Sequence, residues 1–129
     1  MRYLSIDDIL DIHQTMIPLF GGESGLLSEG ALENCVAVPM IAVFGIEPNP
    51  TLWDKAASLM HCIVTRHPFV DGNKRTAWAS MKVFLLLNDY RLATETEESE
   101  SVILNVIGGV IDIDALSKWI EAHSTQCEK

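Results

Sequence analysis

The chain carries the stretch HPFVDGNKRTAWASMKVFLLL at residues 67–87, in which a polar loop leads directly into the most apolar segment of the sequence. Pro68 disfavours helical backbone for the residue before it, so a helix preceding the loop is expected to end near Arg66. The next helix is expected to start at Asn73 or Lys74. Its apolar side chains surround almost the whole axis: Trp78, Met81, Val83, Phe84, Leu85 and Leu87. A helix that is apolar on nearly all sides is a buried central helix.

Helix signals also occur on both sides of this stretch. Ser5 with Asp8, and Thr51 with Asp54, resemble capping boxes, in which each of the two side chains binds a backbone N–H at the start of a helix. Three further helices are expected before the loop: one starts after Ser5 and ends at Pro18 and Gly21-Gly22, one starts after Ser28 and ends at Pro39, and one starts after Thr51 and ends near Arg66. Two more are expected after the central helix. The fourth covers Val102–Ile107 and ends at Gly108-Gly109, and the fifth starts at Asp112 or Asp114 and continues past Ile120. The acidic run 94–101 is expected to cap the fourth of these.

The sequence predicts an all-α fold, a compact helical bundle that forms a single domain over residues 1–129. Apolar residues make up 48% of the chain, enough to bury a core at this length. Periodicity does not decide the short runs Val102–Ile107 and Val110–Ile113, so strands remain the alternative there. Prolines make the segment 44–50 irregular. It is either a plain connector or a segment that docks a target.

The charge balance limits the classes of partner. The chain has 18 acidic and 9 basic residues, whereas a domain that grips phosphate backbones usually has the opposite sign. We therefore expect no direct nucleic-acid binding. No apolar run is long enough to span a bilayer, and the start of the chain lacks the apolar core of a signal peptide, so no membrane contact is expected.

The three cysteines indicate neither a disulfide framework nor a zinc site, because their number is odd and no C-x-x-C pair occurs. Cys35 and Cys62 lie in apolar runs and are interpreted as small core residues, and Cys127 as an exposed residue without a role. A reducing cytoplasm is the expected setting.

The start of the central helix has the features of an anion site. Gly72 lets the backbone approach a ligand closely. At Asn73, Lys74 and Arg75 the helix begins, and its free N–H groups and positive dipole end attract anions. The two basic side chains add full charges, and Arg75 is able to bind a phosphate through two nitrogens.

The residues before this helix supply a base and a metal ligand. Asp71 is suited to hold Mg²⁺ together with substrate phosphates. His67 faces the same loop, and its neutral imidazole is able to take a proton from an incoming hydroxyl. Phe69 and Val70 are expected to anchor the loop to the core. Together these features favour phosphoryl or nucleotidyl transfer.

Each of these residues alone has an ordinary structural interpretation, such as a core histidine, a surface lysine or a turn. Because they all occur within nine positions at the start of a helix, a functional site is favoured over these structural interpretations. Other sites fit poorly. The Walker pattern lacks its first glycine, no H-E-x-x-H occurs, and Asp71 does not begin an EF-hand series.

The segment His67–Arg75 resembles the Fic family signature H-P-F-x-D/E-G-N-G/K-R and matches it at every position. The region 21–32, Ala56-Ala57, Thr76-Ala77 and Trp119 resemble the Doc (death-on-curing) branch, so that the resemblance covers nearly the whole chain. It implies the compact all-α Fic/Doc fold and an enzyme that uses ATP and Mg²⁺ to modify a hydroxyl of a protein. The implied roles are a general base (His67), a metal ligand (Asp71), a loop anchor (Phe69), and an anion or phosphate site (Gly72, Asn73, Lys74 and Arg75).

Lys74 distinguishes two reactions within the family. AMP-transferring members usually carry glycine at this position, whereas Doc toxins carry lysine and are associated with transfer of the γ-phosphate. The lysine favours a toxin kinase, with elongation factor Tu as the target known in the family. Pro68 and Gly72 are also kept in AMP-transferring members, so an AMP transferase is the alternative. A catalytically idle protein-binding module is the third possibility.

Many Fic proteins inhibit themselves through a segment S/T-x-x-x-E-G/N. Here Ser124-x-x-x-Glu128 is followed by lysine, so the pattern is incomplete. The resemblance therefore implies a separate antitoxin protein, whose disordered tail folds as a helix into a groove of this domain.

Overall fold

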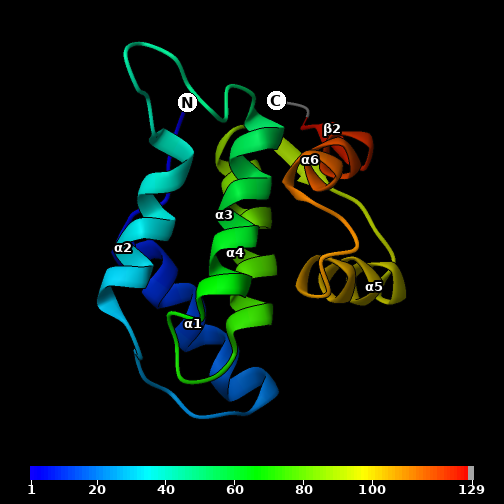
Figure 1. The fold of residues 1–129 in the computed structure, drawn as a ribbon. Coiled ribbons are helices and arrows are strands. Elements are labelled where there is room, and N and C mark those ends of the chain that lie inside the picture. The colour runs from blue at the N-terminus through cyan, green and yellow to red at the C-terminus, as the bar shows by residue number, and fades with distance from the viewer. Residues whose placement is uncertain (128–129) are drawn as a thin grey trace.

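The computed structural model describes residues 1–127 and is mainly helical (Figure 1). Its helices are α1 (Ile6–Phe20), α2 (Glu29–Ala37), the short 3₁₀ helix η1 (Val38–Met40), α3 (Leu52–Arg66), α4 (Asn73–Leu87), α5 (Thr96–Ile107) and α6 (Ile113–Ala122). Two short strands, β1 (Tyr90–Leu92) and β2 (Ser124–Gln126), pair in antiparallel fashion. The all-α prediction is confirmed. Glu128 of the incomplete inhibitory pattern lies outside the described residues.

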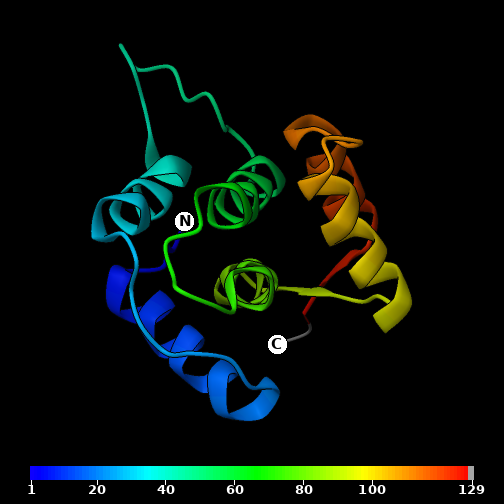
Figure 2. The same cartoon turned by 60° about the horizontal axis from the view of Figure 1, so that its bottom comes forward.

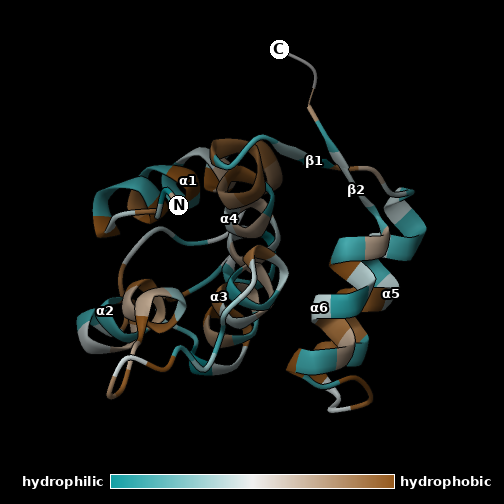
Figure 3. Ribbon diagram, turned by 90° about the horizontal axis from the view of Figure 1, so that it is seen from above, coloured by the Kyte–Doolittle hydropathy of each residue, from teal (hydrophilic) through white to brown (hydrophobic). Residues whose placement is uncertain are grey.

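Helices α3 and α4 form the centre of the molecule. In Figures 1 and 2, α1 and α2 flank this pair on one side, and α5 and α6 on the other. The core side chains of α4 are fully buried, namely Ala77, Met81, Phe84 and Leu85. The prediction of a buried central helix is therefore confirmed. Helix α3 is buried to a similar extent, and every residue from Lys55 to Met60 is at most 2% exposed. Hydrophilic positions lie along much of the outer surface of α1 and α6 (Figure 3).

The capping signals mark the helix starts correctly. The hydroxyls of Ser5 and Thr51 accept from the N–H groups of Asp8 and Asp54 at 3.1 and 3.0 Å, and both boxes are reciprocal. Ser28 caps α2 through the N–H of Ala31. These contacts join residues three positions apart, which is why the sequence alone reveals them.

The predicted ends of the elements differ in detail. Pro18 lies inside α1, which continues to Phe20 and stops at Gly21. Helix α5 begins within the acidic run, so that Glu97 and Glu98 occupy its first turn, where the helix dipole favours negative charge. The strand alternative for 102–107 is wrong, since these residues are helical, and 110–113 forms no strand. The strands β1 and β2 were not predicted, because they are too short to show periodicity.

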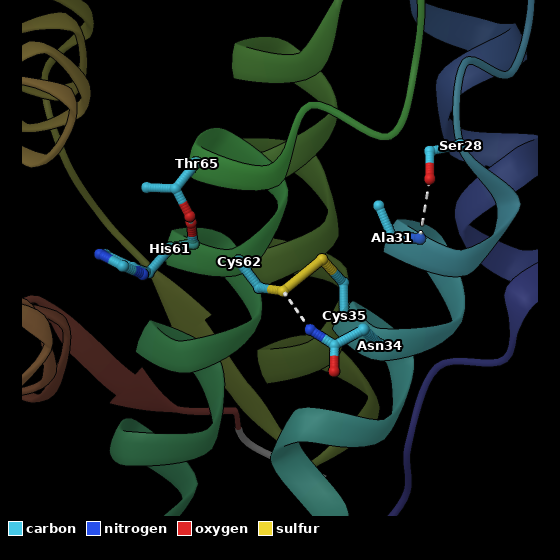
Figure 4. Close-up of a disulfide and its surroundings, with 7 residues drawn as sticks. All are labelled: Ser28, Ala31, Asn34, Cys35, His61, Cys62 and Thr65. Atoms are coloured by element: carbon cyan, nitrogen blue, oxygen red, sulfur yellow. Dashed lines mark hydrogen bonds between the residues drawn. A yellow bond between two sulfur atoms is a disulfide. The ribbon is translucent and has the colours of Figure 1, made fainter.

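The prediction that the cysteines form no disulfide is wrong. The structure joins Cys35 of α2 to Cys62 of α3, with their Cα atoms 5.4 Å apart (Figure 4). Both are buried, as expected for core residues. The cysteines are 27 positions apart and meet only because α2 packs against α3, so that counting and spacing do not reveal the pair. Cys127 has no disulfide partner and is half-buried.

Candidate functional site

The loop 67–72 connects the end of α3 to the start of α4 and lies at one end of the helix pair (Figure 1). Left-handed backbone occurs at both ends of the loop: φ is 49° at His67 and 77° at Gly72. Such a conformation is uncommon for a residue with a side chain and easy for glycine. The chain therefore turns sharply at both ends of the loop. His67, Val70 and Asp71 are exposed, whereas Pro68 and Phe69 are buried.

A hollow of about 430 Å³ opens over this loop. It is lined by His67, Val70, Asp71, Gly72, Asn73, Lys74 and Arg75. All the predicted site residues thus meet at one place except Phe69, which does not line the hollow. Phe69 is instead 1% exposed, a location that suits an anchor of the loop.

The backbone at the start of α4 faces this hollow without a capping side chain. Gly72 occupies the N-cap position, and no acidic residue lies in the first turn. The first N–H groups of a helix have no partner within the helix. Together with the helix dipole, they favour an anion at this point. Lys74 is exposed here and adds its charge.

The side chain of Asn73 has a different task from the predicted anion binding. Its Oδ1 accepts from the Phe69 N–H at 3.0 Å, and its Nδ2 donates to the Phe69 carbonyl at 2.9 Å. Both bonds are buried. The amide group of Asn73 therefore clamps the loop to the helix, and only its backbone N–H remains for a ligand.

The carboxylate of Asp71 accepts hydrogen bonds from two backbone N–H groups. Its Oδ1 accepts from the Gly72 N–H at 2.8 Å, and its Oδ2 from the Glu23 N–H at 3.4 Å. Within residues 1–127, no cluster of three or more His, Cys, Asp or Glu residues is arranged to hold a metal. Mg²⁺ is commonly bound by one or two carboxylates together with substrate phosphates. The exposed Asp71 carboxylate at the hollow fits that mode of binding.

Arg75 is anchored to the end of α1. Its Nη1 donates to the Phe20 carbonyl at 3.0 Å, and its guanidinium carbon lies 4.4 Å from the centre of the Phe20 ring. The carbonyl end of a helix carries negative partial charge, which attracts a cation. Arg75 also lines a second groove of about 550 Å³, bordered by α1, α4 and the start of α5.

Three neighbours of the loop were not among the predicted site residues, and all come from α1 and the segment after it: His13, Phe20 and Gly22. His13 is 4% exposed, and its Nε2 lies 2.8 Å from the Asp71 carbonyl oxygen. Gly22 passes so close to Asp71 that a Cβ at this position would lie 2.8 Å from Asp71 Oδ2. Two signals pointed here: a histidine on an otherwise apolar helix face and a Gly-Gly pair after the helix.

The segment 25–28 supports the loop from the side of α2. The N–H groups of Leu27 and Ser28 donate to the Pro68 carbonyl at 2.8 and 3.0 Å, and the Val70 N–H donates to the Gly25 carbonyl at 3.1 Å. The loop is thus held by backbone bonds on one flank and by side chains of α1 and α4 on the others.

The irregular segment 44–50 lies at the opposite end of α3 from the hollow (Figure 1). The 15-residue helix α3 separates the two, a length of about 22 Å at the usual rise per residue. Docking of a target at segment 44–50 stays a prediction, and a target bound there would have to extend over this distance to reach the hollow. No helix in the described range, 1–127, is long and apolar enough to cross a bilayer.

Comparison with known proteins places this loop within a shared region. Residues 3–85 match the family described as Fic/DOC. The chain is 37% identical over 118 residues to "Toxin Doc" of Mycolicibacterium smegmatis (strain ATCC 700084 / mc(2)155), which covers 90% of this chain and 88% of that protein. It is 26% identical over 103 residues to "Protein kinase doc" of Escherichia phage P1, with 80% and 81% covered.

Proposed function

Because the chain belongs to the Fic/Doc family, we propose that it is the toxin of a toxin–antitoxin pair and transfers a phosphoryl group from ATP to a hydroxyl of a target protein. The observation that carries the proposal is the hollow at the start of α4, in which an exposed histidine, a carboxylate, the backbone N–H groups of the helix start and two cations lie together. These are the groups that phosphoryl transfer requires.

The residues divide the chemistry among them. His67 removes the proton of the target hydroxyl, whose oxygen then bonds to the γ-phosphorus as the bond to the β-phosphate oxygen breaks. The products are a phosphorylated protein and ADP. The backbone N–H groups of Gly72 and Asn73 stabilise the negative charge, with Lys74 and Arg75. Asp71 would hold Mg²⁺, which would neutralise phosphate charge.

Two features favour the γ-phosphate as the transferred group. Lys74 is exposed at the second position of α4, where it reduces the space that glycine would leave and adds positive charge. The relative from phage P1 bears the name of a protein kinase. Transfer of AMP is the alternative, because Pro68 and Gly72 are kept as in AMP-transferring members. An idle binding module is less compatible with His67, Asp71 and Arg75 at one hollow.

We propose a separate antitoxin as the partner that restrains this site. The 550 Å³ groove shares Arg75 with the hollow and is lined by apolar side chains, among them Met16, Phe20, Trp78, Leu86 and Ile103. An amphipathic antitoxin helix in this groove would contact Arg75 and block access to the hollow. The proposed target, elongation factor Tu, places the toxin in the cytoplasm, without direct nucleic-acid or membrane contact. The whole of residues 1–129 would act as one domain.

The test is a transfer assay with ATP labelled at either the α- or the γ-phosphate, together with Mg²⁺ and a cell lysate or purified elongation factor Tu. We expect protein-bound label only from the γ position, and none with the variant His67→Ala. The variant His61→Ala is the matched control, because His61 lies in α3, the helix that ends directly before His67, and does not line the hollow. Label from the α position would establish AMP transfer instead. Absence of both labels would contradict an enzymatic role.

A further inference from the structure

We propose that His13 is a positioning residue of the candidate transfer site, which holds the Asp71–Gly72 peptide so that the Gly72 N–H faces the hollow. The proposal rests on the function proposed above for the hollow. His13 belongs to α1, lies 58 positions before Asp71, and does not line the hollow itself.

The hydrogen bond of His13 determines the orientation of one peptide group. Its Nε2 lies 2.8 Å from the Asp71 carbonyl oxygen, and because a carbonyl only accepts, Nε2 carries the hydrogen. In a trans peptide, the C=O and the following N–H point in opposite directions. With the carbonyl turned toward α1, the Gly72 N–H points away from it and donates to Asp71 Oδ1 at 2.8 Å. The Asp71 carboxylate therefore occupies this N–H in the structure, and a bound anion would have to replace it as the acceptor.

This peptide needs an external restraint because of the residue that follows it. Gly72 has φ 77°, and glycine populates both signs of φ about equally. The peptide before a glycine is therefore free to rotate at little cost. Apart from the bond between the Gly72 N–H and the exposed carboxylate of Asp71 itself, the other bonds of the loop fix different groups: Asn73 holds Phe69, and the segment 25–28 holds Pro68 and Val70.

The ring of His13 is held in place by its own surroundings. It stacks on the Phe69 ring at 3.8 Å between centroids and 5° between planes. One turn further along α1, Ile17 Cδ1 approaches the position that a Cβ of Gly72 would occupy. His13 therefore connects the rigid helix α1 to two points of the loop, the anchor at Phe69 and the carbonyl of Asp71. A histidine that served only as a core side chain would not have to donate a hydrogen bond from its ring N–H to the Asp71 carbonyl.

Two variants separate the donor from the ring. His13→Phe keeps an aromatic ring for stacking on Phe69 and removes the donor. His13→Gln removes the ring and keeps an N–H at the end of a side chain of similar reach. In His13→Phe we expect the affinity for ATP with Mg²⁺ to fall by about tenfold, the effect of one hydrogen bond lost at a partly buried carbonyl. The exchange of the Gly72 amide hydrogen should become faster by a similar factor. His13→Gln should stay within about threefold of the wild type in both measurements.

The control is His61→Phe, the same substitution in α3 outside the hollow, which should leave ATP affinity and Gly72 exchange unchanged. Unchanged values in His13→Phe would overturn the proposal, and a loss in His13→Gln alone would assign the effect to the ring. Equal losses in both His13 variants would also overturn it, because the retained N–H of His13→Gln would then have made no difference. If His13→Phe does not fold, ¹⁵N NMR of the wild type tests the proposal by identifying the tautomer of His13. A hydrogen on Nε2 supports the proposed hydrogen bond, and a hydrogen on Nδ1 alone refutes it. A wild type that exchanges as described and transfers no phosphate would contradict only the proposed function.

Discussion

At the scale of single residues, the structure changes the role of Asn73 from a ligand-binding side chain to a clamp. The sequence places it among residues that bind anions, and its neighbours Lys74 and Arg75 are indeed exposed. Asn73 is instead buried, with 8% of the residue exposed. Its side chain forms hydrogen bonds with both polar groups of the Phe69 backbone. A polar side chain at a helix start serves the loop or the ligand, and only the geometry distinguishes the two.

Replacement of Asn73 by alanine should therefore affect folding as well as activity. Both polar backbone groups of Phe69 would lose a buried partner, which costs about 1 kcal/mol each, so we expect a loss of about 2 kcal/mol in the free energy of unfolding. Urea denaturation measures this loss. Lys74→Ala is the control and should unfold like the wild type. An Asn73→Ala protein that loses transfer activity at full stability would restore the ligand-binding role.

Gly22 offers a sharper test of the place of Asp71. In Gly22→Ala the new Cβ would lie 2.8 Å from the Asp71 carboxylate, whereas a Cβ at Gly21 has open space around it. Both glycines have positive φ, so both variants should lose about 1 kcal/mol of stability through backbone strain. Only Gly22→Ala should displace the carboxylate and weaken Mg²⁺-dependent ATP binding, measured by calorimetry. Equal binding by the two variants would exclude a role for the position of Asp71.

At the scale of helices and strands, the sequence predicts what is local and misses what is distant. The caps at Ser5, Ser28 and Thr51 join residues three positions apart, so the starts of α1, α2 and α3 were predicted correctly. The pairing of β1 with β2 joins Tyr90 to Gln126, and the contact of His13 with the loop spans 58 positions. Such contacts depend on how helices pack, which local patterns do not encode. The residues lining the hollow were found because they lie within one short segment.

The start of α3 also illustrates how a local cap becomes a contact between helices. Asp54 belongs to the capping box of α3, and its Oδ1 also accepts from the hydroxyl of Ser117 in α6 at 2.7 Å. Burial alone would raise the pKa of Asp54. The hydrogen bonds from Ser117 and Thr51, with the charge of Lys55, outweigh this effect and hold the pKa below its ordinary value.

This direction predicts how stability depends on pH. A folded-state pKa below the unfolded value means that the ionised Asp54 stabilises the fold above the unfolded pKa, and that this contribution is lost as the pH falls through the folded pKa. At pH 7, Asp54→Asn should reduce the free energy of unfolding by about 1 kcal/mol, as for other lost helix caps. The difference from the wild type should shrink below about pH 4.

Urea denaturation of both proteins at pH 7 and pH 3 provides the measurement. Asp8→Asn serves as the control, since Asp8 occupies the same position in the box of α1 and makes no hydrogen bond to another helix. A difference between the wild type and Asp54→Asn that stays constant down to pH 3 would contradict the pKa direction.

At the scale of the whole molecule, the disulfide connects the two supports of the loop. Cys62 lies in α3, five residues before His67, and Cys35 lies in α2, which follows directly on the segment 25–28 that pairs with the loop. Disulfides persist mainly in oxidising compartments, so the cysteines no longer favour the cytoplasm. The proposed cytoplasmic location therefore depends on the target. In a reducing compartment, the same positions would hold two buried thiols.

Alkylation of the unfolded, unreduced protein followed by mass spectrometry tests the disulfide. We expect one labelled thiol, at Cys127, and none in Cys127→Ser, because Cys35 and Cys62 are bonded to each other. Reduction should release two further thiols and lower the free energy of unfolding by about 2–4 kcal/mol, the usual contribution of such a link. Three thiols before reduction would show that the pair is not bonded.

Reduction of the disulfide should affect stability more than activity. The loop keeps its bonds to His13, Asn73 and the segment 25–28 without the disulfide. Reduction should therefore lower stability while leaving phosphoryl transfer largely intact below the melting range. A parallel loss of transfer in the folded, reduced protein would mean that the α2–α3 link itself positions the loop.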